Sequence, residues 1–284
     1  MFELPYTTDY TLLADWVELQ LTIEESHMSR SALSRRIEML TGDFSEHLAG
    51  EVWAELERRA HAYSPERIRV VDDLVYPPQS NAITPTYVAC LLFSLYGFDR
   101  EHRTDPKLFE RLVGEALARY LGGEVFIFGW PVMSGQSADI RQRIRELASR
   151  ICEHFIEEPA STYKDRGVDV IGWRPFPEKV PDNHRGSQVV VLTQCATGAN
   201  WEDKTTELPL EAWMDYLHWK SRPIKSFAVP KVIPQNRWHD ISKEGGLLFD
   251  RIRIVNLIAD NLSDPCLLTE LTDWTNEETL GARG

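Results

Sequence analysis

Apolar side chains recur every three to four positions between residues 9 and 64, which is the spacing of amphipathic helices. Residues 64–85 interrupt the pattern with four prolines, and an ordinary helix does not continue through proline. A further helical run covers residues 87–95, and Gly97 is placed to end it. The pattern predicts a helical N-terminal domain that comprises residues 1–100.

Beyond residue 100 the pattern changes repeatedly between helical and strand periodicity. In chain order it predicts a helix over 105–121, a strand over 124–130, a helix over 137–156, strands over 167–173 and 187–195, a helix over 201–219, strands over 227–233 and 246–249, and a helix that begins near Asp250 with an ion pair. This alternation is typical of a mixed α/β fold. We expect a central mixed sheet flanked by helices in a domain of residues 101–284.

The composition is that of an ordinary globular protein. Of the 284 residues, 43% are hydrophobic and 26% are charged, and Gly and Pro contribute 16 each. These proportions exclude disordered, collagen-like and disulfide-scaffold proteins. The length is enough for one large domain or two modest ones, in keeping with a division near residue 100.

The distribution of charge limits where a nucleic acid would bind. The formal charge of -13 argues against a surface that is basic overall and binds any polyanion. Residues 1–100 carry 8 Lys and Arg against 16 Asp and Glu, whereas residues 161–260 carry 14 against 13 and contain five of the nine Trp. Any nucleic-acid site is therefore expected in the second segment, on a small and salt-sensitive surface.

Targeting and metal-binding motifs are absent from the sequence. The chain starts without a basic region followed by an apolar run, and no stretch reaches the roughly 18 apolar residues of a membrane span. The Cys residues form no CxxC pair, and the His residues form no HxxxH or HExxH motif, so neither zinc ligation nor a disulfide framework is expected. We expect a cytoplasmic protein with reduced thiols and no membrane association.

A carboxylate interrupts the apolar strand predicted at 167–173. Asp169 lies between Val168 and Val170, where an unpaired charge is costly, so we expect it at the mouth of the strand or bound to a cation. The next strand ends in the polar amide of Gln194, and Lys204 follows in the next predicted helix. This unusual combination marks a candidate site.

In these segments the sequence resembles the PD-(D/E)xK nuclease superfamily, which has the restriction-endonuclease-like fold, and its Mrr-like branch in particular. In that superfamily a helix with a Glu packs beside a strand with an Asp, and the next strand carries a (D/E)xK or QxK triplet. The matching segments are Phe109-Glu110, Gly167-Val168-Asp169 and Thr193-Gln194-Cys195-Ala196, and the resemblance covers about residues 105–220. The helical N-terminal part lies outside it.

The sequence departs from the superfamily pattern at two positions. Gln194 stands in the acidic position, as in the QxK variant, and Ala196 stands where the Lys is expected, which leaves Lys204 as the substitute. A literal search for the motif selects Asp182 with Glu202-Asp203-Lys204 instead. We rank that choice lower, because Asp182 lies in a segment of turn composition and acids are common where a helix begins.

Helix geometry selects a second carboxylate. On the helix predicted over 105–121, Glu110 lies about 80° from the centre of the apolar stripe and Glu115 about 140° from it. Glu110 is therefore the acid that can face a cleft, whereas Glu115 is expected in solvent.

The resemblance implies a role for each of these residues. Asp169, Gln194 and Glu110 would hold Mg²⁺ or Mn²⁺ through oxygen ligands. Lys204 would orient the attacking water or stabilise the transition state. The residues expected to contact the substrate are Lys164, Arg174 and Asn200.

The sequence hypothesis is a metal-dependent DNA endonuclease, and the resemblance suggests a role in prokaryotic defence against foreign DNA. The acidic N-terminal domain is suited to dock a basic partner protein or to restrain the site, and a homo-oligomer is left open. The alternative is a non-catalytic, nuclease-like binding or structural subunit of a multiprotein complex, in which Gln194 and Ala196 reflect lost activity. An RNA-directed nuclease would differ from the first hypothesis only in its substrate.

Overall fold

The structure is a computed structural model, and it describes residues 5–41, 45–64, 66–97, 106–177, 186–259 and 262–281. The chain folds into two compact units. The first unit comprises residues 1–104, 230–234 and 251–284, and the second unit comprises residues 105–229 and 235–250. The sequence pattern predicts one domain over residues 101–284, whereas in the structure residues 251–284 belong to the first unit.

The first unit is mainly helical. Its helices are α1 (Tyr10–Glu24), α2 (Arg30–Thr41), α3 (Ser45–Ala62), α4 (Pro85–Tyr96), α9 (Arg251–Ile258) and α10 (Pro265–Gly281), with a short 3-10 helix η2 (Ser80–Ala82). Asp9 caps α1 by accepting hydrogen bonds from the N–H groups of Thr11 and Leu12. The proline-containing segment 64–85, which interrupts the helical pattern, contributes two strands to an antiparallel sheet of order β1-β3-β2, formed by β1 (Met28–Ser29), β2 (Arg69–Val71) and β3 (Leu74–Tyr76).

A fully buried ion-pair network joins the helices of the first unit. Arg59 of α3 donates to Asp15 and Glu18 of α1 at 2.6 and 2.7 Å, and Arg251 of α9 donates to the same two carboxylates at 2.6 and 3.1 Å. Tyr87 of α4 donates to Glu18 at 2.6 Å. Burial alone would raise the pKa of Asp15, but Arg251 and Arg59 hold it well below its usual value. The return of the chain therefore supplies a cation that the core of the first unit requires.

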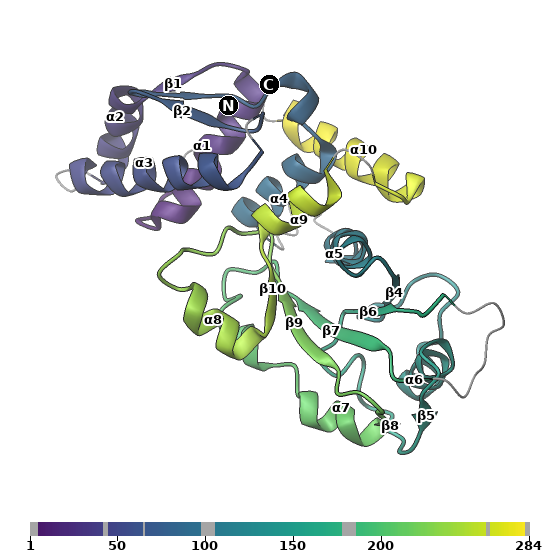
Figure 1. Ribbon diagram of the computed structural model, residues 1–284. Coiled ribbons are helices and arrows are strands. Elements are labelled where there is room, and N and C mark those ends of the chain that lie inside the picture. Colours follow the sequence, from purple (N-terminus) through teal and green to yellow (C-terminus); the bar gives the residue numbers. More distant parts are fainter. Residues whose placement is uncertain are drawn as a thin grey trace. The chain divides into compact units, whose positions relative to one another are not determined.

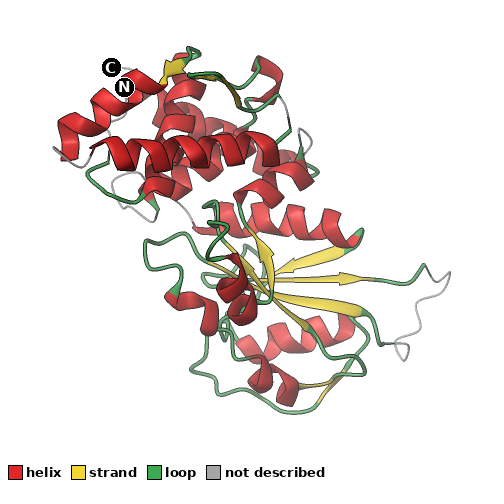
Figure 2. Ribbon diagram, turned by 60° about the vertical axis from the view of Figure 1, so that its left-hand side comes forward, coloured by secondary structure: helices red, strands yellow, loops and turns green. Residues whose placement is uncertain are grey.

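The second unit consists of a sheet between helical layers (Figures 1 and 2). Its strands are β4 (Glu124–Ile127), β6 (Val170–Arg174), β7 (Val189–Cys195), β9 (Ile224–Ala228) and β10 (Leu247–Phe249), in the order β10-β9-β7-β6-β4. Strands β4, β6 and β7 form an antiparallel meander. Strand β9 runs parallel to β7, and β10 runs parallel to β9. The predicted mixed α/β class, with a central mixed sheet flanked by helices, is confirmed.

The two faces of this sheet have different partners, as Figure 1 shows. On one face lies α5 (Pro106–Leu121), which approaches closely because Gly172 of β6 leaves room for Leu117. On the other face α6 (Ile140–Arg150) and α7 (Leu210–Tyr216) share a core with Ile171 and Trp173 of β6 and with Leu192 of β7. Neighbouring residues of one strand therefore point into different layers.

The helix predicted over 201–219 is divided into shorter elements. A 3-10 helix η3 (Asp203–Thr206) is followed by α7 and then by β8 (Leu217–His218), which pairs with β5 (His154–Phe155). Pro209 stands at the start of α7, and a proline has no N–H with which to continue the preceding helix. A further helix, α8 (Trp238–Gly245), had no counterpart in the prediction.

Candidate functional site

Asp169 lies where β4, β6 and β7 reach the same end of the sheet. Its N–H donates to the carbonyl of Thr193, and its own carbonyl accepts from the N–H groups of Phe128 and Gly129, just beyond β4. Its carboxylate accepts a hydrogen bond of 2.7 Å from the N–H of Cys195. These bonds fix the carboxyl group at the mouth of β6, where the sequence analysis expects it.

Glu110 brings a second carboxyl group to the same place from α5. Its side chain is buried, and Lys107, one turn earlier on the helix, donates a hydrogen bond to it. A Cβ atom at Gly129 would lie 2.6 Å from a Glu110 oxygen and 2.7 Å from an Asp169 oxygen. Both carboxyl groups therefore face one small space, which exists because residue 129 has no side chain.

Burial raises the pKa values of both acids. The pKa of Glu110 is raised to about 8, mainly by burial and secondly by the charge of Asp169, whereas Lys107 lowers it. Burial raises the pKa of Asp169 to about 6, against the lowering effect of the Cys195 N–H. Burial and the two neighbouring acids also raise the pKa of the Cys195 thiol. This thiol is therefore unsuited to act as a nucleophile.

Gln194 lies on the other face of the sheet from α5 and Glu110. Leu192, two residues earlier on β7, belongs to the core under α6 and α7, and strand alternation places Gln194 on that same face. Its amide nitrogen donates to Glu207 at 3.1 Å, and its amide oxygen is buried without a hydrogen-bond partner among the described residues. Cys195, not Gln194, is the residue of β7 that faces the acids. Of the three expected metal ligands, the structure brings two together.

The other residues expected in the site are spread over the second unit. Lys204 of η3 is half-buried and close enough to Asp169 to lower the pKa of that acid. Lys164 is exposed in the loop that precedes Asp169. Asn200 is exposed after the end of β7. Arg174 is at the opposite end of β6, roughly 16 Å along the strand, so it does not accompany the carboxyl pair.

The alternative motif is only partly described by the structure. Asp182 lies outside the described residues. Glu202 forms an ion pair of 2.5 Å with Arg237 and lines a cavity of about 380 Å³ with other acids, namely Asp203, Asp240 and Glu244. Glu202 is therefore engaged at a different place from Glu110 and Asp169.

Three residues that shape the site were not selected from the sequence. Lys107 precedes Glu110 by one helical turn, and this spacing was a signal that could have been used. Gly129 gave no signal, because its importance depends on how α5 approaches the strand end. Arg143 of α6 is fully buried and donates to the carbonyl groups of Phe128 and Lys164, which holds together the two loops beside the acids.

The carboxyl pair suits a hard divalent cation. Among the described residues, no group of three or more His, Cys, Asp or Glu side chains is arranged to hold a metal ion. Mg²⁺ nevertheless keeps several of its waters and is usually bound through one or two carboxylates together with substrate phosphates. Glu110 and Asp169 supply two such groups, and a cation between them would offset the repulsion that contributes to the raised pKa of Glu110.

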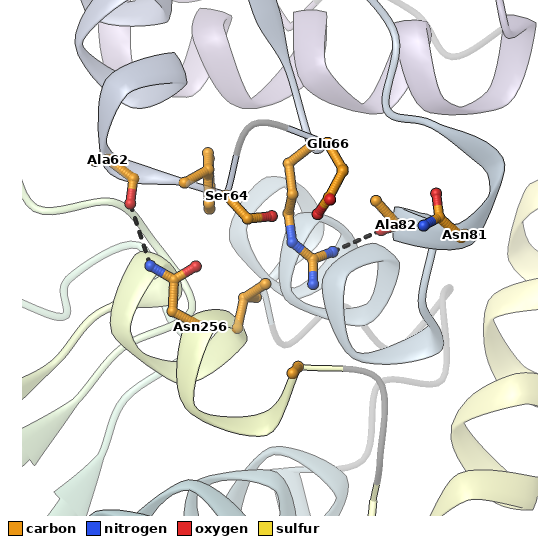
Figure 3. Close-up of a pocket in the computed structure, with 10 residues that line it drawn as sticks. Ala62, Ser64, Glu66, Asn81, Ala82 and Asn256 are labelled. Carbon is orange, nitrogen blue, oxygen red and sulfur yellow. Dashed lines mark hydrogen bonds between the residues drawn. The ribbon is translucent and has the colours of Figure 1, made fainter.

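The first unit has a cavity of its own, of about 440 Å³, which Figure 3 shows in close-up. Asn256 at its wall donates to the carbonyl group of Ala62 at 3.1 Å, and Arg67 donates to that of Ala82 at 2.6 Å. These polar side chains are thus bonded to the protein's own backbone. The carboxyl pair of the second unit is the better candidate for chemistry.

Comparisons with known protein families, with curated proteins and with solved structures give no match for this chain. Within the part of the chain that the structure describes, every helix is too short or too polar to cross a membrane.

Proposed function

We propose that the second unit is a metal-dependent phosphodiesterase that cleaves DNA, with a restriction-endonuclease-like fold. The observation that carries this proposal is the pair of carboxyl groups, of buried Glu110 and half-buried Asp169, that face one space at Gly129. Acids with raised pKa values are frequent at functional sites, and this pair lies together at the end of a sheet.

The order of elements supports the proposal. A helix with a Glu, α5, packs beside the strand that follows Asp169, and β7 is the next strand in both the chain and the sheet. This is the arrangement on which the resemblance to the nuclease superfamily rests. The proposed role in prokaryotic defence rests on that resemblance alone. The proposed docking of a partner by the first unit rests on its acidic charge alone.

Each residue of the site has a defined task under this proposal. Glu110 and Asp169 would hold Mg²⁺ or Mn²⁺, which supplies an activated water and neutralises charge on the phosphate when bound. Lys107 holds the carboxyl group of Glu110 in place and adds a positive charge beside it. The N–H of Cys195 fixes the orientation of Asp169, and Gly129 keeps the space between the acids open. Lys204 lowers the pKa of Asp169 and so favours its ionised form.

Cleavage of a supercoiled plasmid in Mg²⁺ and in Mn²⁺ tests the proposal. We expect the wild type to nick or linearise the plasmid, and Glu110→Gln and Asp169→Asn to lose at least about 100-fold of the rate, because each removes a metal ligand. Glu115→Gln is the matched control, since Glu115 is on the same helix and pairs with Arg119 at 3.9 Å instead of facing Gly129. Equal rates for all four proteins, or no cleavage of the plasmid or of a single-stranded oligonucleotide in either metal, would overturn it.

The second candidate function is a non-catalytic subunit of the same fold. It is favoured by one observation, namely that the amide of Gln194 donates to Glu207 and lies on the face of β7 opposite α5 and Glu110. Isothermal titration with Mn²⁺ distinguishes the two candidate functions by metal binding instead of cleavage. Binding that both Asp169→Asn and Glu110→Gln abolish supports the metal site, whereas no binding by the wild type favours the non-catalytic subunit.

A further inference from the structure

Two exposed aromatic residues lie in the two loops that lead to and from the carboxyl pair. Trp130 directly follows Gly129, the residue at which Glu110 and Asp169 meet, and it is 38% exposed. Tyr163 lies in the loop that leads to Asp169 and is 39% exposed. Single exposed aromatic residues are common on protein surfaces, so it is the presence of two of them in the loops that meet at the acids that points to a ligand.

Each of the two rings carries a cation over its face. The ammonium of Lys164 lies 5.4 Å from the centre of the Trp130 ring, and the guanidinium carbon of Arg166 lies 4.0 Å from the centre of the Tyr163 ring. We call these four residues the aromatic ledge. The ledge therefore combines flat apolar surfaces with positive charge in a chain whose net charge is -13.

The ledge is held in place by groups that serve the two loops at once. The guanidinium of Arg143 lies 4.4 Å from the ring centre of Phe128 and donates to the carbonyl groups of Phe128 and Lys164. Asp165 accepts a hydrogen bond of 3.2 Å from the N–H of Trp130. The loop that carries Trp130 and the loop that carries Lys164 are thus joined before any ligand binds.

A cation above an aromatic ring is not in itself evidence of a ligand. The pair formed by Arg150 and Phe126, with 4.7 Å from guanidinium to ring centre, belongs to the core of the same unit, because the Phe126 ring is only 3% exposed. The rings of Trp130 and Tyr163 differ from it, since more than a third of each residue is in solvent. Core packing accounts for the first pair and leaves the other two unexplained.

We propose that the aromatic ledge binds unpaired bases of a single-stranded nucleic acid and places the adjoining phosphodiester at Glu110 and Asp169. Stacking on a ring needs a free base face, which a duplex hides between its base pairs, and Lys164 and Arg166 would contact the phosphates on either side. This inference rests on the proposed function for the phosphodiester at the acids. The stacking of bases on the ledge is testable without cleavage.

Fluorescence anisotropy measures this binding directly. The probes are labelled oligothymidylate and oligouridylate of about 12 nucleotides and a hairpin duplex of matched length, in EDTA and again in Ca²⁺. We expect both single strands to bind more tightly than the duplex. Trp130→Ala and Tyr163→Ala should each weaken single-strand binding by about 5- to 100-fold, and Trp130→Phe should retain most of it.

Phe176→Ala is the matched control, because Phe176 is an aromatic residue of the same unit that is 62% exposed but lies beyond the far end of β6. It should bind the single strands like the wild type. Thermal unfolding of each variant shows whether it is folded. If Trp130→Ala does not fold, Tyr163→Ala and Trp130→Phe still test the role of the rings. Duplex binding as tight as single-strand binding, or equal losses from Phe176→Ala and Trp130→Ala, would overturn the inference.

The two proposals fail in different ways. If Glu110→Gln and Asp169→Asn bind single strands normally and only lose cleavage, both proposals are supported. If no protein cleaves but the ledge variants still weaken single-strand binding, the ledge is supported and the phosphodiesterase is not. Tighter binding of oligothymidylate identifies DNA as the strand that the ledge receives, and tighter binding of oligouridylate identifies RNA. Either result supports the ledge.

Discussion

Glu110 of α5 and Asp169 at the start of β6 each place a carboxyl oxygen within 2.7 Å of the point where Gly129 would carry its Cβ atom. The two acids are 59 positions apart in the sequence and come from a helix and a strand that pack face to face. Their closeness is unfavourable without a proton or a cation between them, because Asp169 contributes, after burial, to the raised pKa of Glu110. A structure with no use for the pair would gain stability by replacing one acid.

Gly129→Ala tests the space between the acids. The new methyl group would meet both carboxyl groups at less than 3 Å, so we expect a loss of about 1 to 3 kcal/mol in the free energy of unfolding and a loss of Mn²⁺ binding. Gly198→Ala in the same unit is the control, because its Cβ would meet only the flexible Asn200 side chain, at 3.2 Å. Urea denaturation and calorimetric titration measure the two effects. Mn²⁺ binding by Gly129→Ala at wild-type affinity would contradict the assigned site.

The pH dependence of stability tests the electrostatics of the pair. The folded-state pKa of Glu110, about 8, is above its usual 4.5, so the folded protein holds this proton more tightly than the unfolded chain does. Its contribution to stability is therefore complete below about pH 4.5 and is lost as pH rises through about 8. Asp169 acts in the same direction between about pH 4 and 6. At about 1.4 kcal/mol per pKa unit, the loss from Glu110 is of the order of a few kcal/mol.

Glu110→Gln cannot ionise and should escape that loss. In EDTA we expect the melting temperature of this variant to rise relative to that of the wild type as pH increases from 5 to 9, with Glu115→Gln as the control on the same helix. Differential scanning fluorimetry over this pH range measures it. If the melting temperature of the wild type instead rose relative to that of Glu110→Gln with increasing pH, the acid would not be held in its protonated form.

The two lysines near the acids are expected to differ in importance. Lys107 is bonded to Glu110 and is 7% exposed, whereas Lys204 is half-buried and acts on Asp169 through space. If the second unit cleaves DNA, Lys107→Met should lower the rate by about 100-fold and Lys204→Met by less than about 10-fold. Single-turnover cleavage rates decide between them. The reverse order would return the catalytic role to Lys204, the residue that the sequence resemblance favours.

Arg251→Met tests whether the C-terminal segment completes the first unit. The substitution leaves the buried carboxylates Asp15 and Glu18 with one cation instead of two, and we expect it to cost about 3 to 5 kcal/mol in the free energy of unfolding. Arg253→Met, on the exposed side of the same helix, should cost less than about 0.5 kcal/mol. Urea denaturation followed by circular dichroism compares them. Equal stabilities would show that α9 is not needed in that core.

The sequence features that selected Glu110 and Asp169 as candidate site residues are also present in the structure. Glu110 is at the edge of the apolar stripe of α5, and Asp169 is a charge in an apolar run, so both signals were local. Gln194 was placed in the same site because it ends the next strand, but the face to which a strand residue points depends on register, and one residue separates Gln194 from Cys195. No pattern within β7 reveals which face α5 will cover.

Long-range pairing also explains why the return of residues 251–284 to the first unit was not predicted. Arg251 was interpreted as part of a local ion pair at a helix start, and its carboxylate partner Asp15 is 236 positions away in the chain. The alternation of helices and strands gave no sign of this, because residues 251–284 are helical whichever unit they join. The same reasoning applies to Gly129, whose role arises only when α5 is packed on the sheet.

The return of Arg251 to the first unit has a consequence for biosynthesis. Residues 10–96 leave the ribosome early, but Asp15 and Glu18 receive their second buried cation only after Arg251 has been translated. At about 5 to 20 residues per second, the interval between residues 104 and 251 lasts roughly 7 to 30 s. During that interval the two carboxylates have only one of their two buried cations, Arg59, whereas all the strands of the larger sheet have been translated by its end. The unit that is encoded first is therefore the one that matures last.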